Sequence, residues 1–214
     1  INRLARVAMR IRDGDYSEAV TIGARGEIGA LAESINLMRD GIAAREKEIL
    51  RLAYQDGLTG LPNRMLFQDR LQQAITYAER QQTSVALLFM DLDRFKDVND
   101  TLGHHVGDLL LQEVTRRIRL CVRGSDTVSR QGGDEYVIML PNLDDPNHDD
   151  LGDIMQVVNK LIESIANPYE LEGHTVHVTT SVGVSIYPQD GVNIGTLIRN
   201  ADTAMYQAKD AGRN

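Results

Sequence analysis

The chain has 214 residues, 42% hydrophobic and 25% charged, which is enough to bury the core of one globular domain with an appendage. Its formal net charge of −8 argues against broad electrostatic binding to DNA or RNA, because such binding needs clustered lysine and arginine. A single cysteine, Cys121, excludes an intramolecular disulfide, and its place in an apolar helical pattern predicts a buried packing role.

The first 55 residues carry two helical patterns joined by a connector. Apolar residues recur at helical spacing over residues 1–11, Asp-Gly-Asp at 13–15 breaks the helix, and Val20 and Ile22 indicate an extended segment. A longer pattern then alternates steps of three and four without a slip, through Ile28, Leu31, Ile35, Met38, Ile42, Arg45, Ile49 and Leu52. This spacing is the heptad seam of a left-handed coiled coil. A lone surface helix is the alternative, but so narrow a stripe favours a parallel dimer or a four-helix bundle.

The short helix, the connector and the start of the second helix, Arg25-Gly26-Glu27-Ile28-Gly29, resemble a HAMP domain over residues 1–40. The resemblance implies a dimeric four-helix bundle that carries signals from a transmembrane sensor to a cytoplasmic output module. Residues 41–55 then look like a coiled-coil signalling helix. The sequence has no run of about 20 apolar residues and no signal-peptide pattern, so we expect the membrane segments to lie upstream, in a missing part of a longer protein.

A domain of different character begins at residues 56–64 (DGLTGLPNR), a loop dense in turn formers, after which helical spacing resumes over 65–77. Residues 84–90 are a continuous apolar run of strand length, typical of a strand covered on both faces. The run ends in Asp91-Leu92-Asp93. Side chains alternate along a strand, so Asp91 and Asp93 are expected on one side, where packing does not explain them.

Short β-prone runs on both sides of residues 130–136 (RQGGDEY) predict a hairpin whose turn contains Gly132 and Gly133. Glycines at a turn permit positive φ and the close approach of another molecule. The adjacent Asp134 and Glu135 offer hard oxygen ligands of the kind that Mg²⁺ prefers. An ordinary solvated hairpin with acidic side chains is the alternative for this motif alone.

The remaining elements complete the expected fold. They are a polar loop over 94–105, a helix from Gly107-Asp108 to Arg119, an acidic loop over 141–150, a helix over 151–165, a hairpin or strand pair over 169–187 and a final helix over 194–211. The order α, β, α, β, β, α, β, β, α predicts an α+β sandwich with helices on a mainly antiparallel sheet.

Five motifs in order make residues 56–214 resemble a GGDEF domain of the diguanylate cyclase family. They are DGLTGLPNR (56–64), DLDRFKDVNDTLGHHVGD (91–108), RQGGDEY (130–136), SVGVSIYP (181–188) and ADTAMYQAKDAGRN (201–214). The resemblance implies a fold like the palm of nucleotide polymerases and class III adenylyl cyclases. It also implies the condensation of two GTP molecules to cyclic di-GMP, with release of two pyrophosphates, between two subunits that each hold one GTP. We therefore expect a homodimer through the HAMP-like and coiled-coil segments.

The resemblance assigns the acidic residues to the metal and the chemistry. It implies that Asp91, Asp134 and the backbone carbonyl of Leu92 bind Mg²⁺ or Mn²⁺. Glu135 is implied as a further metal ligand or as an aid to deprotonating the ribose 3′-hydroxyl, and both roles stay open. Asp93 matches an acidic position without a defined role in catalysis.

Substrate contacts are implied in the same way. Gly132 and Gly133 would admit the phosphates and the base edge of the nucleotide. The other substrate-binding residues are Asn99 and Asp108, which would read guanine, His104, which would contact the substrate, and Lys96, Lys209 and Arg213, which would meet the phosphates. Taken singly, these residues also fit a loop turn, an N-cap, an exposed histidine or charges that complement a helix dipole.

Two further features refine the resemblance. Arg123 and Asp126 fit the RxxD pattern that binds the product as an allosteric inhibitor in this family, since a guanidinium can hold a guanine edge or a phosphate in a fork. A surface Arg–Asp pair at a helix end is the alternative. Tyr136 stands where the family name has Phe, so we expect its ring to pack beneath the hairpin and its hydroxyl to find a partner.

The sequence thus predicts a HAMP-linked diguanylate cyclase from the cytoplasmic portion of a bacterial inner-membrane protein, inhibited by its product. A regulatory module that binds GTP or cyclic di-GMP without turnover is the alternative, and such modules are often fused to a downstream EAL phosphodiesterase domain. A purely structural dimerisation protein would account for residues 1–55 but would leave Asp91, Asp134 and Glu135 unexplained.

Overall fold

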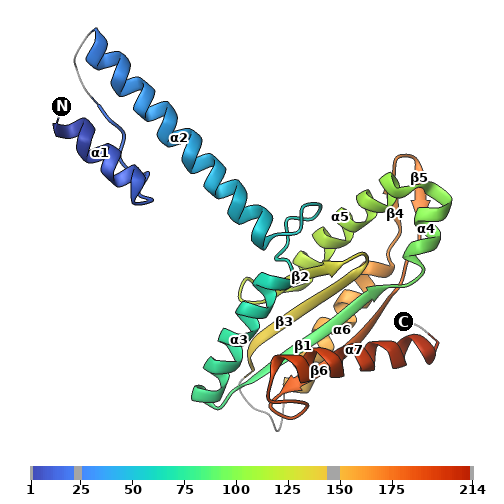
Figure 1. Ribbon diagram of the computed structural model, residues 1–214. Helices are drawn as coiled ribbons and strands as arrows, with labels where there is room; N and C mark the ends of the chain where they lie inside the picture. The colour runs from blue at the N-terminus through green and yellow to red at the C-terminus, as the bar shows by residue number, and fades with distance from the viewer. Residues whose placement is uncertain (1, 22–25, 144–149, 213–214) are drawn as a thin grey trace. The chain divides into compact units, whose positions relative to one another are not determined.

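The computed structural model describes residues 2–21, 26–143 and 150–212. The chain divides into two compact units, Ile1–Ala53 and Tyr54–Asn214, which we describe separately (Figure 1). Ile22 of the predicted connector and Arg25 of the HAMP-like motif lie outside the described residues. None of the described helices is both long and apolar enough to cross a lipid bilayer.

The first unit contains helix α1 (Asn2–Arg12) and most of helix α2 (Glu27–Tyr54), as the two helical patterns predict. A small core joins α1, the connector and α2 through Leu4, Val7, Val20 and Ala32. The extended connector is fixed to α2 by two hydrogen bonds: the Val20 N–H donates to Asn36 Oδ1 at 2.8 Å, and Asn36 Nδ2 donates to the Val20 carbonyl at 3.0 Å.

Much of the predicted heptad seam remains exposed in the single chain. Ile28, Leu31, Met38, Ile49 and Leu52 have exposed fractions between 45% and 64%. Burying this stripe would require another helix, so the seam is available for the expected homodimer.

The second unit is built on a four-stranded antiparallel sheet in the order β2-β3-β1-β6. Its strands are β1 (Ser84–Leu92), β2 (Thr127–Gly132), β3 (Glu135–Leu143) and β6 (Thr180–Tyr187). Strand β1 is central and buried along its whole length, as its continuous apolar run predicts. A separate two-stranded sheet is formed by β4 (Tyr169–Leu171) and β5 (His174–Val176).

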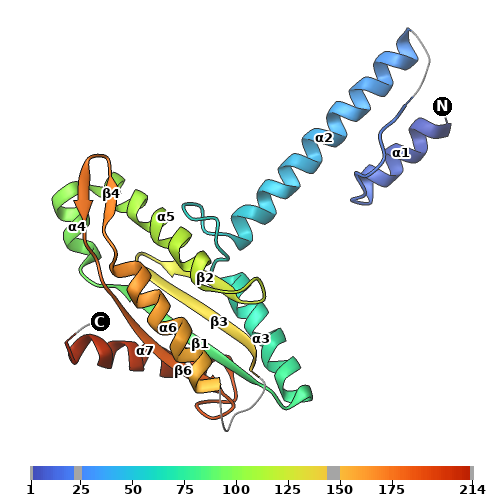
Figure 2. The same ribbon diagram turned by 180° about the vertical axis from the view of Figure 1, so that it is seen from behind.

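Helices cover both faces of the sheet. Helices α3 (Arg64–Gln81) and α7 (Ile194–Asp210) pack on one face, where they meet Val85, Leu87 and Phe89 of β1 (Figure 1). Helices α5 (His104–Cys121) and α6 (Asp150–Ala166) pack on the other, against the alternate residues of β1 (Figure 2). The predicted α+β sandwich is confirmed, and Cys121 is buried as expected.

Four local predictions were wrong or incomplete. Residues 95–102 form helix α4 (Phe95–Leu102) instead of part of a polar loop, because Phe95, Val98 and Leu102 pack against the core. Helix α5 begins at His104 instead of Gly107. Gly103, with φ of 86°, is both the C-cap of α4 and the N-cap of α5, so the two helices are separated by a single residue. The segment 169–187 contains the predicted hairpin as β4 and β5, but its last strand, β6, belongs to the four-stranded sheet. Strand β3 continues to Leu143 into the predicted acidic loop, of which residues 144–149 lie outside the described part.

Candidate active site

The C-terminal end of β1 brings acidic residues from separate strands together. Asp91 lies directly opposite Glu135 of β3 and Ser181 of β6 in the sheet register. Residues opposite one another in an antiparallel pair project from the same face. Asp91 and its two partners project from the face of the sheet that α7 covers. Lys209 of α7 donates from Nζ to Asp91 Oδ1 at 2.6 Å. The strand register therefore brings the end of β1 beside the hairpin that carries Glu135.

The hairpin turn depends on its two glycines. Gly132 has φ of 145° and Gly133 has φ of 53°, conformations that L side chains rarely adopt. A Cβ at either position would meet no atom within 4 Å, so the glycines serve the backbone conformation and leave open space around the turn. Asp134 follows at the tip and is half-buried.

Burial and the acidic surroundings of this corner raise the proton affinity of Asp91 and Glu135. Burial raises the pKa of Asp91, the hydrogen bond from Lys209 opposes it, and the nearby charges of Asp134 and Asp93 add to it. The pKa of Glu135 is also raised, by burial first and then by the charges of Asp91, Asp202 and Asp134. The corner therefore carries more negative charge than Lys209 compensates, and a cation bound there would relieve the repulsion.

The side chains at this corner could bind a hard cation only together with other oxygen ligands, such as a backbone carbonyl or substrate phosphate oxygens. Within the described ranges, no three His, Cys, Asp or Glu side chains are grouped closely enough to hold a metal ion by themselves. Leu92, the last residue of β1, buries its side chain in the core, so any ligand it supplies would be its backbone carbonyl. Carboxylates, a carbonyl and substrate phosphate oxygens are together the ligands typical of protein-bound Mg²⁺.

Asp93 has a structural role that the sequence did not reveal. Its Oδ1 accepts a hydrogen bond from Ser181 Oγ at 2.9 Å, and its Oδ2 accepts one from Thr179 Oγ1 at 2.6 Å. Its backbone N–H also donates to the Thr179 carbonyl at 2.9 Å. These bonds fasten the end of β1, where Asp91 lies, to the start of β6.

The predicted guanine-reading residues lie on α4 and α5. Asn99 is half-buried on α4, while His104, the first residue of α5, and Asp108, in its second turn, are exposed. Asp108 is therefore not an N-cap, and that alternative reading is wrong. Lys96 is exposed on α4, which begins three residues after β1 ends. Arg213 lies outside the described residues.

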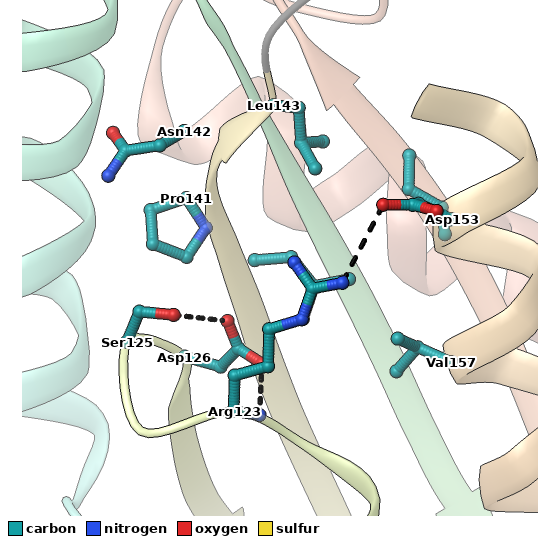
Figure 3. A pocket seen from close by; sticks show the side chains of 10 residues that line it. Arg123, Ser125, Asp126, Pro141, Asn142, Leu143, Asp153 and Val157 are labelled. Atoms are coloured by element: carbon teal, nitrogen blue, oxygen red, sulfur yellow. Dashed lines mark hydrogen bonds and ion pairs between the residues drawn. The ribbon is translucent and has the colours of Figure 1, made fainter. Parts of the chain in front are cut away.

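The predicted allosteric residues border a pocket of about 260 Å³ between the α5–β2 turn, β3 and α6 (Figure 3). Asp126 Oδ2 accepts a hydrogen bond from the Arg123 backbone N–H at 2.6 Å, so this carboxylate closes the turn instead of pairing with the guanidinium. The Arg123 side chain reaches toward Asp153 of α6, with 3.6 Å between Nη2 and Oδ2. The surface Arg123–Asp126 ion pair considered as an alternative is not formed.

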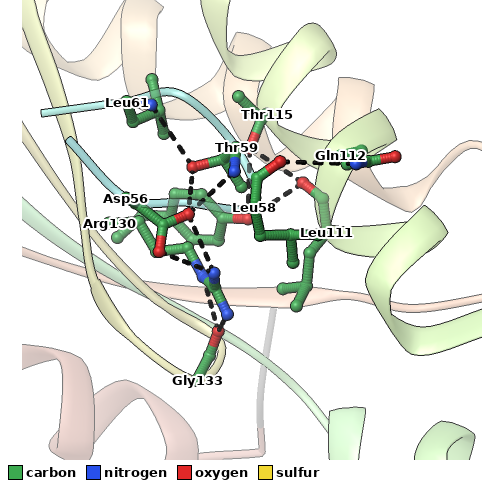
Figure 4. A network of polar contacts seen from close by, with 10 residues as sticks. Asp56, Leu58, Thr59, Leu61, Leu111, Gln112, Thr115, Arg130 and Gly133 are labelled. Atoms are coloured by element: carbon green, nitrogen blue, oxygen red, sulfur yellow. Dashed lines mark hydrogen bonds and ion pairs between the residues drawn. The ribbon is translucent and has the colours of Figure 1, made fainter. Parts of the chain in front are cut away.

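A polar network beneath the hairpin was missed by the sequence analysis (Figure 4). Arg130 Nη1 donates to both carboxylate oxygens of Asp56, at 2.9 and 3.0 Å, while Nε and Nη2 donate to the Gly133 carbonyl at 2.9 and 2.7 Å. Burial alone would raise the pKa of Asp56, but hydrogen bonds from Thr59 and Arg130 outweigh it and lower the pKa. Asp56 opens the motif DGLTGLPNR and Arg130 opens the motif RQGGDEY. Their membership in these motifs was the only feature of the sequence that could have indicated their pairing.

Tyr136 packs beneath the hairpin, as expected. The side chain is fully buried, and its hydroxyl donates to the Leu111 carbonyl at 3.1 Å and lies 3.3 Å from Thr115 Oγ1. Burial raises the pKa of Tyr136 to about 12, so the hydroxyl is neutral at physiological pH. The extra oxygen relative to Phe is thus accommodated without disturbing the acids on the opposite face of the sheet.

The chain thus combines a helical N-terminal unit with an α+β domain that carries acidic residues at one end of its central strand. Family models match both parts: the model described as "Diguanylate cyclase, GGDEF domain" matches residues 53–214, and the HAMP domain model matches residues 1–44. The chain belongs to the GGDEF diguanylate cyclase family and carries a HAMP domain before the GGDEF domain. The two resemblances found in the sequence are confirmed.

Relatives and solved structures agree. The chain is 46% identical over 179 residues to the bifunctional diguanylate cyclase/cyclic di-GMP phosphodiesterase MucR of Pseudomonas aeruginosa, covering 84% of this chain and 25% of MucR. It is 36% identical over 222 residues to the diguanylate cyclase TpbB of the same species, covering 100% of this chain and 50% of TpbB. A solved structure that comprises only the GGDEF domain of TpbB from Pseudomonas aeruginosa superposes with a TM-score of 0.71 at 38% identity, over 75% of this chain and 91% of that one. The chain thus spans half or less of these two relatives.

Proposed function

We propose that this chain is an active diguanylate cyclase regulated through its helical segment. In this proposal residues 1–40 are the HAMP-like domain, residues 41–55 the signalling helix and residues 56–214 the GGDEF domain. The observation that supports it most is the register of Asp91 opposite Glu135, with Lys209 at 2.6 Å, beside an open Gly-Gly turn. A structural role alone would not gather uncompensated acids at an accessible strand end.

The reaction condenses two GTP molecules to cyclic di-GMP and releases two pyrophosphates. Each ribose 3′-oxygen would attack the α-phosphorus of the nucleotide held by the facing subunit. Asp91, the Leu92 carbonyl and Asp134 would hold Mg²⁺ or Mn²⁺, and Glu135 would join them or help to remove the 3′-hydroxyl proton. When bound, the ion neutralises triphosphate charge and lowers the pKa of the attacking hydroxyl.

Other residues of the chain would bind and orient the nucleotide. Asn99 and Asp108 would read the guanine, and His104, which begins α5 between them, would contact the substrate. Lys96, Lys209 and Arg213 would meet the phosphates, while Gly132 and Gly133 would let the phosphates approach the turn backbone. Since positioning for in-line attack supplies much of the rate in phosphoryl-type transfer, losing any one contact should slow the reaction.

Regulation would operate at two places. The HAMP-like domain and signalling helix would form the homodimer, linked upstream to a membrane sensor, and a signal would change how two GTP-loaded domains approach. Cyclic di-GMP would bind at Arg123 and Asp126 as a product inhibitor. The exposed Arg123 guanidinium at the rim of the 260 Å³ pocket supports this role, because its 3.6 Å ion pair with Asp153 leaves other donors of its fork for a guanine edge or a phosphate.

The test is incubation of the chain with GTP and Mg²⁺, with pyrophosphate and cyclic di-GMP followed by chromatography. Wild type and the matched control Asp69→Ala, an exposed acid on α3, should form both products, whereas Asp134→Ala should form neither while remaining folded. Equal rates for wild type and Asp134→Ala would contradict the metal assignment. GTP binding without any product in wild type would instead support a regulatory binding module.

A further inference from the structure

Gly107 occupies the first turn of α5, where its lack of a side chain is not explained by backbone conformation. Its φ lies in the ordinary helical range, and glycine within a helix is unfavourable relative to alanine. A Cβ on residue 107 would overlap Asn99 Oδ1 and would stand 3.0 Å from Asn99 Cγ and 3.3 Å from Phe95 Cζ. The glycine therefore leaves the space that the Asn99 side chain fills.

The Asn99 side chain is placed by packing and keeps its polar groups available. Asn99 is half-buried between α4 and α5, and its backbone carbonyl accepts from the Gly103 N–H at 2.9 Å. Its carboxamide makes no hydrogen bond to any residue that the structure describes. A carboxamide offers one acceptor and two donors, so an amide held in one place by its neighbours is ready to bind a ligand edge.

We infer that Gly107 is a positioning residue that sets the selectivity for guanine over adenine by leaving room for the Asn99 carboxamide. This inference rests on the proposed function, in which Asn99 reads the base. Guanine and adenine differ in the donors and acceptors along their base edges, so a fixed carboxamide can match one and mismatch the other. A carboxamide displaced by a methyl group at position 107 would lose that match, because hydrogen-bond discrimination depends on placement.

The experiment measures binding of the α,β-methylene analogues of GTP and ATP, which cannot release pyrophosphate, by calorimetry in the presence of Mg²⁺. Wild type, Gly107→Ala, Asn99→Ala and the double variant are compared. The control is Gly195→Ala in the first turn of α7, where a Cβ would meet its nearest atom at 3.6 Å. We expect Gly107→Ala to lose about tenfold or more of the guanine preference, equivalent to one hydrogen bond to the base, and Gly195→Ala to lose none.

The double variant separates positioning from general damage. If Gly107 acts through Asn99, then Gly107→Ala should cost nothing further in the Asn99→Ala background, and any folding defect of the single variant should be relieved there. Undiminished guanine preference in Gly107→Ala, or a further loss in the double variant, would overturn the inference about Gly107 but would leave the proposed function intact. Wild type with no preference for the guanine analogue would overturn both this inference and the proposed function.

Discussion

Arg130 connects two parts of the GGDEF domain that are distant in sequence. It joins Asp56, 74 residues away, to the Gly133 carbonyl, so one guanidinium holds both the loop that opens the GGDEF domain and the turn that carries Asp134. Its side chain is only 11% exposed and that of Asp56 20%, so the ion pair between them is largely shielded from water. The turn glycines supply the required conformation, and Arg130 selects one geometry among those that glycine permits.

Removing this guanidinium should loosen the turn. We expect Arg130→Ala to lower the free energy of unfolding by about 1.5–3 kcal/mol, the usual contribution of hydrogen bonds to charged groups, and to lower kcat for cyclic di-GMP formation. Thermal melts and initial rates measure the two effects. Arg119→Ala is the control, since Arg119 makes one 3.4 Å bond to the Gly60 carbonyl of the same loop and should change neither quantity much. A fully active Arg130→Ala variant would show that the turn needs no such support.

The charge of Glu135 should reduce stability at neutral pH. Its folded-state pKa is raised, so the folded protein holds this proton more tightly than the unfolded chain. That stabilisation is present below the ordinary glutamate pKa of about 4.3 and is lost as pH rises through the raised value. Without divalent cations, Glu135→Gln should therefore melt at a higher temperature than wild type at pH 7, and the difference should shrink toward pH 4.

The control for this comparison is Glu79→Gln, an exposed residue on α3 away from the acidic corner, which should leave the melting curve unchanged. A Glu135→Gln variant that melts below wild type at pH 7 would contradict the repulsion inferred from the geometry. The same variant should lose activity if Glu135 binds the metal or assists deprotonation, so stability and catalysis would change in opposite directions.

Among the elements, α7 determines where Lys209 lies. Gly183 of β6 allows the close approach, because a Cβ there would overlap the Ala201 carbonyl oxygen and the Met205 nitrogen and stand 2.8 Å from the Ala204 carbonyl carbon. These are backbone atoms that cannot rotate aside. Helix α7 therefore rests directly on β6, with its C-terminal end beside Asp91.

Gly183→Ala should push α7 away from the sheet. We expect a loss of about 1–3 kcal/mol in the free energy of unfolding, typical of overpacking, together with reduced activity as Lys209 moves away from Asp91. Denaturant unfolding and GTP turnover test this. Gly195→Ala, on α7 itself, should be neutral or slightly stabilising, because the new methyl group would meet its nearest atom at an ordinary contact distance of 3.6 Å. Equal stability of the two variants would mean that α7 can shift freely.

Sequence periodicity predicted the elements that have local signals. The buried β1 run, the Gly132-Gly133 turn and the long pattern of α2 each follow from residues close together in the chain. Helix α4 was missed because its eight residues are mostly polar and its helical character depends on Phe95 packing on a distant core. The Asp56–Arg130 pair was missed for a related reason, since periodicity carries no information about which polar residues meet across 74 positions.

At the scale of the whole molecule, the account requires two chains. Each GGDEF domain would hold one GTP, so the chemistry is incomplete in a monomer, and the exposed seam of α2 is the surface available for pairing. Ile49 and Leu52 on this seam are 64% and 61% exposed in the single chain. The neighbouring Leu50 is 52% exposed but lies off the heptad positions, which provides a matched control.

A charge on the seam should dissociate the dimer. We expect Ile49→Glu to shift the chain toward monomer at a given concentration, because pairing would bury an unpaired carboxylate, whereas Leu50→Glu should leave the dimer intact. Sedimentation velocity gives the oligomeric state of both variants. Equal dissociation by the two substitutions would show that general hydrophobicity, and not the heptad seam, holds the chains together.

The rate of cyclic di-GMP formation per chain, measured over protein concentrations that span dimer dissociation, tests the central claim most directly. The account predicts that this specific rate is near zero for monomer, rises with the dimer fraction and then reaches a plateau, with Ile49→Glu reaching it only at higher concentration. A specific rate that stays constant down to monomeric chain, or dimer that binds GTP and forms no cyclic di-GMP, would contradict the proposal of a two-chain diguanylate cyclase.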